Sequence, residues 1–138
     1  MAGGTAAQAH PASGFAGRRV LVVEDEFLVA LDLKSLLEGF GCAVLGPVGS
    51  VAEALACLDP DPPDAALLDV QLAAGNTAGL ARTLIGRGVP FVVMTGYDRA
   101  HLTEPVLRDA PLLGKPLDEA ALRRTLLDLL GPGGAERS

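Results

Sequence analysis

Three short segments of the sequence carry apolar residues side by side instead of in alternation with polar ones. They are RVLVV at 19–23, DAALLDV at 64–70 and VPFVVMTG at 89–96. A strand with one face in water alternates apolar and polar residues, whereas a parallel strand covered by helices on both faces is apolar almost throughout. These segments therefore predict the central strands of a parallel sheet that is buried on both sides.

The segments between these strands predict the helices and the outer strands of the same sheet. Their apolar residues, glycines and capping residues have the spacing of short globular helices or strands. The predicted helices are residues 26–41, 50–58, 76–88 and 117–131, and the two further strands are residues 42–48 and 110–114. Strands and helices thus alternate along the chain, which predicts an α/β fold with a doubly wound, five-stranded parallel sheet.

Two of the predicted helices carry clear start signals, and one segment resists assignment. Ser50 with Glu53 three residues later has the spacing of a capping box, and Asp118 precedes the last helix as a capping residue. The segment 97–110 contains Pro105, which interrupts a helical pattern because it lacks the backbone N–H. We therefore expect any fourth helix in this segment to be short or irregular.

Length and composition predict one globular domain. The chain has 138 residues, of which 49% are apolar and 4% aromatic, and this suffices for one core of Leu, Val and Ala. Residues 1–17 are rich in Ala, Gly, Ser and Pro without hydrophobic periodicity. We expect a disordered tail over residues 1–17, a domain over residues 18–131 and a flexible tail over residues 132–138.

Charge and cysteine content exclude several classes of protein. The net charge of −6 disfavours nucleic-acid binding, which needs a basic face. The N-terminus lacks the basic start and apolar run of a signal peptide, and no segment has the length of a membrane span, so we expect no membrane association. Cys42 and Cys57 have neither C-x-x-C spacing nor a nearby histidine, which indicates free thiols in a cytoplasmic protein.

Polar residues stand where the predicted parallel strands end. Glu24 and Asp25 follow the first strand, Asp69 the third, Thr95 the fourth and Lys115 the fifth. Ligands of doubly wound sheets bind at these carboxyl ends. Three adjacent carboxylates favour a hard divalent cation such as Mg²⁺. A metal, a hydroxyl and a lysine beside a nucleophilic carboxylate predict phosphoryl transfer to Asp69.

Other interpretations of these residues remain open at this point. Taken alone, Asp69 could cap a loop and Lys115 could be a solvated charge, while Glu24 and Asp25 also suit the start of a helix. A hydrolase with this metal site would need an acid or base such as an aspartate two residues after Asp69, where the chain has Gln71. An adaptor that binds proteins without phosphorylation is a further alternative.

From Arg18 to about Leu130 the sequence resembles the receiver domains of two-component response regulators. The motifs VVEDE, LLDVQL, MTG and GKP stand in the order of that family. The resemblance implies a flavodoxin-like receiver fold in which Asp69 accepts a phosphoryl group from a histidine kinase or a histidine phosphotransfer protein. Such a domain is a signalling switch and not an enzyme in the usual sense.

The resemblance also implies a role for each neighbour of Asp69. Asp25 would bind Mg²⁺ directly, Glu24 mostly through water, Gln71 through its backbone carbonyl, and Thr95 and Lys115 would contact the phosphoryl group with help from the Gly96 N–H. The Lys115–Pro116 peptide bond would be cis.

Two features depart from the usual receiver pattern. Receivers usually carry Tyr or Phe three residues before the lysine, where this chain has Leu112. The MTGY region and the short segment after it resemble the FATGUY subgroup, although Val93 and Met94 replace the Phe-Ala of that subgroup. Because GPGGAERS alone follows Leu130, we expect a stand-alone receiver that signals through contacts with a downstream protein or serves as a phosphoryl sink.

Overall fold

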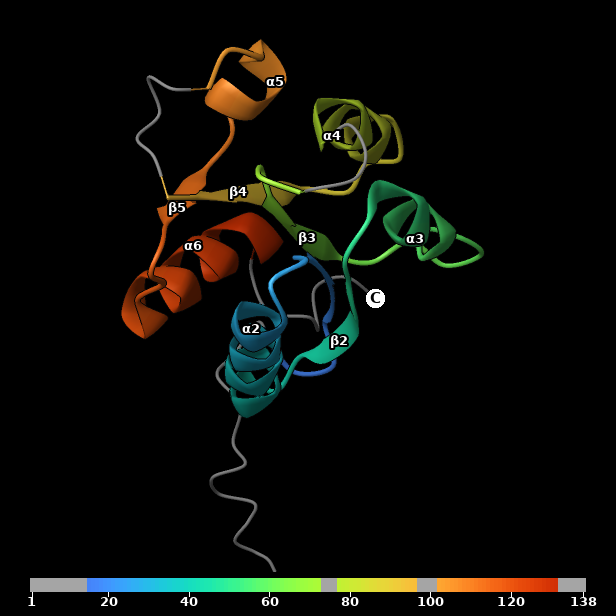
Figure 1. The fold of residues 1–138 in the computed structure, drawn as a ribbon. Coiled ribbons are helices and arrows are strands. Elements are labelled where there is room, and N and C mark those ends of the chain that lie inside the picture. Colours follow the sequence, from blue (N-terminus) through green and yellow to red (C-terminus); the bar gives the residue numbers. More distant parts are fainter. Residues whose placement is uncertain (1–14, 73–76, 97–101, 132–138) are drawn as a thin grey trace, which may run out of the picture.

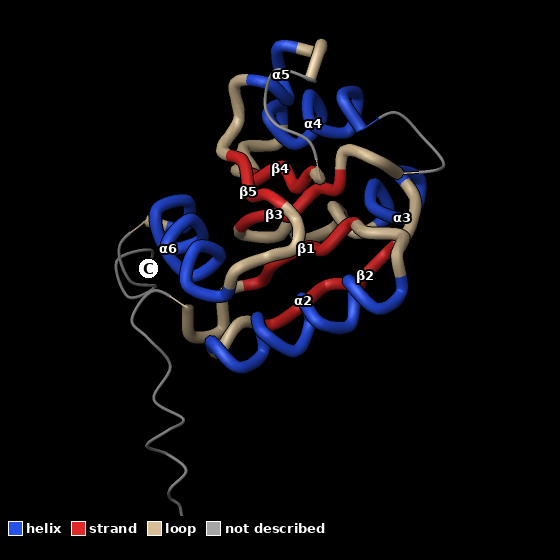
Figure 2. Tube along the Cα trace, turned by 60° about the vertical axis from the view of Figure 1, so that its left-hand side comes forward, coloured by secondary structure: helices blue, strands red, loops and turns tan. Residues whose placement is uncertain are grey.

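A computed structural model of the chain describes residues 15–72, 77–96 and 102–131. These residues form a parallel sheet with the strand order β2-β1-β3-β4-β5, and helices cover both of its faces (Figures 1 and 2). The strands are β1 (Arg19–Val23), β2 (Ala43–Val48), β3 (Ala65–Asp69), β4 (Phe91–Thr95) and β5 (Leu112–Gly114), and the helices are α2 (Phe27–Phe40), α3 (Val51–Ala56), α4 (Thr77–Gly86), α5 (Pro105–Arg108) and α6 (Glu119–Leu130). The predicted doubly wound, five-stranded fold is confirmed.

The central strands are buried because each sends alternate side chains into one of two apolar clusters. Val20 and Val22 of β1 pack with residues of α2 and α6, whereas Leu21 and Val23 pack with residues of α3 and α4 on the other face. Every residue of β3 and β4 is buried. A strand between two helical layers has no face in water, which is why its consecutive residues are nearly all apolar.

Helices α3 and α6 begin at the capping residues predicted from the sequence. The Ser50 hydroxyl accepts a hydrogen bond from the Glu53 N–H at 3.1 Å. The Glu53 carboxylate accepts a second one from the Gly49 N–H at 3.1 Å. The Asp118 carboxylate accepts a hydrogen bond from the Ala121 N–H at 2.9 Å. These bonds satisfy N–H groups that have no partner within the helix.

The segment before β5 contains a single helical turn. Helix α5 spans Pro105–Arg108, and Pro105 lies in its first turn. The prediction of a short fourth helix is confirmed, but Pro105 begins this helix and does not interrupt it. Proline is tolerated there because the first N–H groups of a helix lack an internal partner. Residues 97–101 of the same segment lie outside the described residues.

The packed structure begins before Arg18, where the sequence analysis placed the start of the domain. The Phe15 side chain is fully buried and stacks on the Phe40 ring with a centroid distance of 5.0 Å. The Gly17 N–H donates to the Gly41 carbonyl at 3.0 Å. Residues 15–17 therefore belong to the packed domain. Residues 1–14 of the tail predicted over residues 1–17, and the tail predicted over residues 132–138, lie outside the described residues.

We predict that Phe15→Ala lowers the free energy of unfolding by about 3–5 kcal/mol, the usual cost of truncating a buried phenylalanine. Phe27→Ala is the matched control, because the Phe27 side chain is 72% exposed and its loss should cost less than about 0.5 kcal/mol. Urea denaturation of both variants gives the comparison. Equal midpoints for the two variants would show that Phe15 does not belong to the core.

Candidate functional site

The register of the parallel strands brings the predicted site residues to one edge of the sheet. Asp69 is the last residue of β3 and pairs with Met94 of β4, so Thr95 lies one residue further along the same edge. Thr95 in turn pairs with Gly114 of β5, which Lys115 follows. The Lys115 N–H donates to the Thr95 carbonyl at 2.9 Å. The site therefore forms because these strands end side by side.

Three carboxylates meet at this edge. One oxygen from each of Glu24, Asp25 and Asp69 lies within 4.8 Å of the other two. Glu24 and Asp69 are buried, and Asp25 is exposed. A cluster of carboxylate oxygens with one open side suits a hard cation that keeps part of its water shell, such as Mg²⁺. The predicted carboxylate ligands thus lie close enough together to share one ion.

Lys115 provides the positive charge inside this cluster. Its Nζ lies 2.8 Å from Glu24 Oε1, 3.3 Å from Asp69 Oδ2 and 3.7 Å from Glu26 Oε1. Burial alone would lower the pKa of Lys115, but the hydrogen bond with Glu24 and the charge of Asp69 outweigh burial and raise it. Lys115 therefore stays an ammonium group. The Lys115–Pro116 peptide bond is cis, as predicted.

The pKa of Glu24 is raised above its ordinary value. Burial is the largest cause, the hydrogen bond with Lys115 opposes it, and Asp69 adds to the increase. Burial removes water from a carboxylate and so favours its protonated form. Three carboxylates thus share one neighbouring lysine, and a bound cation would favour the ionised form of each.

Backbone N–H groups fix the orientation of the two buried carboxylates. The Gln71 N–H donates to Asp69 Oδ1 at 2.9 Å, and the Glu26 N–H donates to Glu24 Oε2 at 3.0 Å. Gln71 therefore contacts Asp69 through its backbone N–H, whereas its predicted carbonyl contact with the metal stays a prediction. Gly96 follows Thr95 at the edge of the site, and a Cβ added there would meet nothing nearer than Gln71 Oε1 at 3.9 Å.

Glu26 is a neighbour of Lys115 that was not predicted from the sequence. It is the third acidic residue of the quoted motif VVEDE, and that position was the available signal. The contact could not be foreseen because it depends on the turn between β1 and α2, which directs the Glu26 side chain toward β5. Glu24, Asp25, Asp69, Thr95 and Lys115 lie at the same edge of the sheet, and their roles stay predictions.

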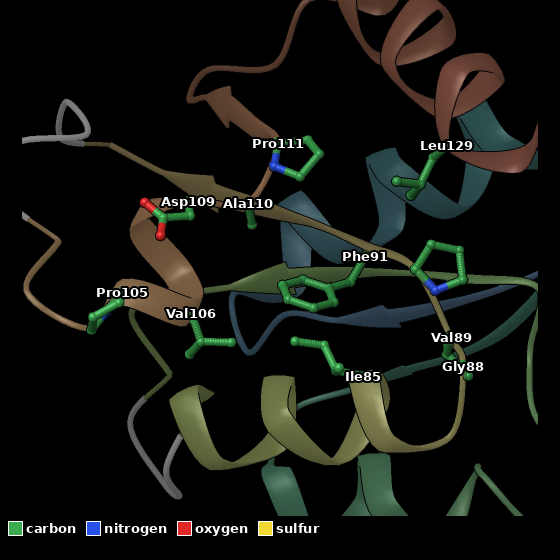
Figure 3. A pocket seen from close by; sticks show the side chains of 11 residues that line it. Ile85, Gly88, Val89, Phe91, Pro105, Val106, Asp109, Ala110, Pro111 and Leu129 are labelled. Carbon is green, nitrogen blue, oxygen red and sulfur yellow. The ribbon is translucent and has the colours of Figure 1, made fainter.

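A second concave surface lies away from this site. Its volume is about 680 Å³, and its lining side chains include Ile85 of α4, Phe91 at the start of β4 and Val106 of α5 (Figure 3). Phe91 begins the strand that Thr95 ends, so this groove and the carboxylate cluster lie toward opposite ends of β4. The groove is apolar and offers no cluster of catalytic groups.

Two further observations concern the thiols and the helices. Cys42 and Cys57 form no disulfide, and burial raises the pKa of the Cys42 thiol to about 11, which makes it a poor nucleophile. Within residues 15–72, 77–96 and 102–131, every helix is too short or too polar to cross a membrane.

Comparison with known proteins places this arrangement in a family, although no family model matches the chain. The transcriptional regulatory protein PdtaR of Mycobacterium tuberculosis is 32% identical over 94 residues, which cover 67% of this chain and 45% of that protein. The chain spans less than half the length of such curated relatives.

Two solved receiver structures match over nearly their whole length. The solution structure of BeF3-activated SdrG from Pseudomonas melonis is 37% identical, with a TM-score of 0.73 and coverage of 84% of this chain and 98% of that chain. The receiver domain of the sensor histidine kinase PA1611 from Pseudomonas aeruginosa is 26% identical, with a TM-score of 0.72 and coverage of 84% and 99%, and it holds a magnesium ion in its active-site cleft. The chain therefore belongs to the receiver domains of two-component response regulators.

Proposed function

We propose that this receiver domain accepts a phosphoryl group on Asp69 from the phosphohistidine of a histidine kinase or a histidine phosphotransfer protein. The observation that carries the proposal is the placement of the Asp69 carboxylate, 3.3 Å from the Lys115 ammonium and within 4.8 Å of carboxylate oxygens of Glu24 and Asp25. A nucleophile, a cation and a set of metal ligands thus share one edge of the sheet, as phosphoryl transfer requires.

The reaction forms one bond and breaks one bond. An Asp69 oxygen bonds to phosphorus while the bond from phosphorus to the histidine nitrogen breaks, and this nitrogen keeps the electron pair. The other ring nitrogen carries a proton, so the group that leaves is a neutral imidazole. Lys115 balances the negative charge of the phosphoryl oxygens, and the Thr95 hydroxyl donates a hydrogen bond to one of them. The resulting acyl phosphate is lost when water attacks the phosphorus and releases phosphate.

The acidic cluster fits a magnesium ion. Asp25 and Asp69 would bind it through their carboxylates, Gln71 through its backbone carbonyl, and Glu24 mostly through water. The ion supplies positive charge against the carboxylates and the phosphoryl oxygens when it is bound. The magnesium ion in the related PA1611 receiver supports this assignment.

We infer that the output passes through protein contacts near α5. Thr95 and Lys115 lie on either side of the segment that contains α5, and Pro105, Val106 and Ala110 of that segment line the apolar groove of Figure 3. Movement of the segment would change the shape of this groove. A downstream protein that binds there would detect phosphorylation, and without such a protein the domain would act as a phosphoryl sink. Two further predictions from the sequence stay predictions. They are the membership of the FATGUY subgroup and a cytoplasmic location, which the free cysteines support.

We predict that the protein incubated with Mg²⁺ and phosphoramidate gains one phosphoryl group on Asp69, which tandem mass spectrometry can locate. Asp69→Asn should abolish the modification, because the amide is not a nucleophile, and should leave the fold intact because it removes one charge from a crowded site. Labelling that persists in the folded Asp69→Asn protein would place the acceptor elsewhere. A wild-type protein that stays unlabelled would favour the adaptor without phosphorylation.

We predict that Mg²⁺ binds with a Kd of roughly 1 mM, since a partly hydrated ion with few protein ligands binds weakly. Asp25→Ala should weaken the binding at least tenfold in isothermal titration calorimetry. Asp32→Ala is the control, because Asp32 is an exposed carboxylate of α2 outside the cluster. Equal affinities of wild type and Asp25→Ala would contradict the assignment of Asp25 as a ligand.

We predict that beryllofluoride, a phosphoryl mimic, changes backbone amide chemical shifts most strongly between residues 95 and 110. The described residues of this segment form one short helix, α5, and its large buried apolar side chains are Leu102 and Leu107. A segment with so few apolar anchors can rearrange at modest cost. Asp69→Asn treated in the same way gives the background. Shift changes confined to the loops around Asp25 and Asp69 would rule out the proposed output.

A further inference from the structure

Glu26 occupies the capping position of α2 without capping the helix. Its side chain makes no hydrogen bond to the first turn, whereas Ser50 and Asp118 at the same position of α3 and α6 do. Glutamate is also not among the residues favoured at this position. Helix capping therefore does not explain why a glutamate stands here.

The Glu26 side chain extends instead toward the phosphorylation site. Its Oε1 lies 3.7 Å from Lys115 Nζ, and the side chain is 66% exposed. The other two carboxylates around this ammonium, Glu24 and Asp69, have side chains that are 0% and 2% exposed. Glu26 is therefore the solvent-facing carboxylate of the three that surround Lys115.

The charges around Lys115 do not balance. Three carboxylates, those of Glu24, Glu26 and Asp69, lie within 4.0 Å of Lys115 Nζ, and Asp25 adds a fourth beside Glu24 and Asp69. With all four ionised, the group has an excess of three negative charges over the one ammonium. A bound divalent cation reduces the excess to one. Replacing Glu26 by glutamine would remove that last charge, so Glu26 decides whether the loaded site repels an incoming anion.

We propose that Glu26 is a specificity-determining residue that selects phosphodonors by charge. It slows phosphorylation of Asp69 by small donors with two negative charges more than phosphorylation by donors with one. A phosphohistidine whose ring is an imidazolium counts as a donor with one net negative charge, because the ring charge offsets part of the phosphoryl charge. The proposal rests on Asp69 being the phosphoryl acceptor.

Two small donors separate these cases. Acetyl phosphate carries about two negative charges at neutral pH, and its transfer breaks the bond from phosphorus to the acyl oxygen, with acetate leaving with the electron pair. Phosphoramidate carries about one net negative charge because its nitrogen is protonated, and its transfer breaks the P–N bond, with ammonia leaving. Both reactions form the same acyl phosphate on Asp69, so their rates compare directly.

The experiment measures the initial rate of Asp69 labelling by each donor at saturating Mg²⁺, for wild type and three variants. Glu26→Gln should accelerate labelling about five- to tenfold with acetyl phosphate and about two- to threefold with phosphoramidate at low salt, as Coulomb's law in water gives for charges roughly 7 Å apart. Glu26→Asp, which keeps the charge, should stay within about twofold of wild type. Both accelerations should disappear near 1 M salt, where the screening length is about 3 Å.

Glu38→Gln is the control for net charge. Glu38 lies 12 residues after Glu26, and its exposed side chain pairs with Lys34. A helix rises about 1.5 Å per residue, so the two positions are roughly 18 Å apart, and Glu38→Gln should leave both rates unchanged.

The outcomes separate the new inference from the function on which it rests. If wild type is labelled on Asp69 but Glu26→Gln changes both rates equally, or changes them by the same factor at low and high salt, the charge filter is wrong while the acceptor assignment holds. If neither donor labels Asp69 in wild type, the acceptor assignment fails and the filter fails with it.

Discussion

The buried ion pair between Lys115 and Glu24, with Asp69 beside it, is the constraint around which the remainder of the site is arranged. Its Nζ–Oε1 distance is 2.8 Å, and the Glu24 side chain is wholly inaccessible to solvent. A charge in this position has lost its water and needs compensation from the protein. The fold supplies this by ending β1, β3 and β5 at one edge, so that residues 45 and 91 positions apart from Glu24 in the sequence become its neighbours. The apolar strands that drive folding thus also fix the charged groups.

Both members of this pair make stability depend on pH, and in both cases stability falls as the pH rises. The pKa of Glu24 is raised from 4.5, so the folded protein holds this proton more tightly than the unfolded chain, and stability falls as the pH rises from about 4.5 through the raised pKa. The pKa of Lys115 is raised from 10.5, so its stabilising contribution is present below 10.5 and is lost as the pH rises through the raised pKa. Between these ranges the site has an ionised lysine and an excess of carboxylate charge. Because of this imbalance, binding of a divalent cation or a change of partner for Lys115 alters the electrostatic energy of the site.

The sequence predicted those parts of the structure that depend on local patterns. Side-by-side apolar residues identified the buried strands, Ser50 and Asp118 identified helix starts, and Asp69 was placed correctly because a strand's carboxyl end is visible in the sequence. Phe15 was missed because its partner, Phe40, is 25 residues away and no periodicity surrounds it. Glu26 was missed for a related reason, since its contact with Lys115 crosses from the first strand to the last. Local sequence patterns predict helices and strands. Contacts between segments that are distant in the sequence become visible only once the sheet is assembled.

Leu112 shows how this receiver differs from the usual pattern at the place where a signal must leave the site. It lies in β5 opposite Val93 and packs, half-buried, against the apolar cluster beneath α3, α4 and α5. At the position where receivers usually carry Tyr or Phe, this chain therefore has an aliphatic side chain that contributes to the core. In the proposed function, transmission would therefore use the backbone. The connection from Thr95 to Lys115 is suited to this, because a hydrogen bond of 2.9 Å joins its two ends and its described part contains one short helix, α5. Under the proposed function, a change in the position of Thr95 would pass through this hydrogen bond to the segment whose Val106 and Ala110 line the apolar groove.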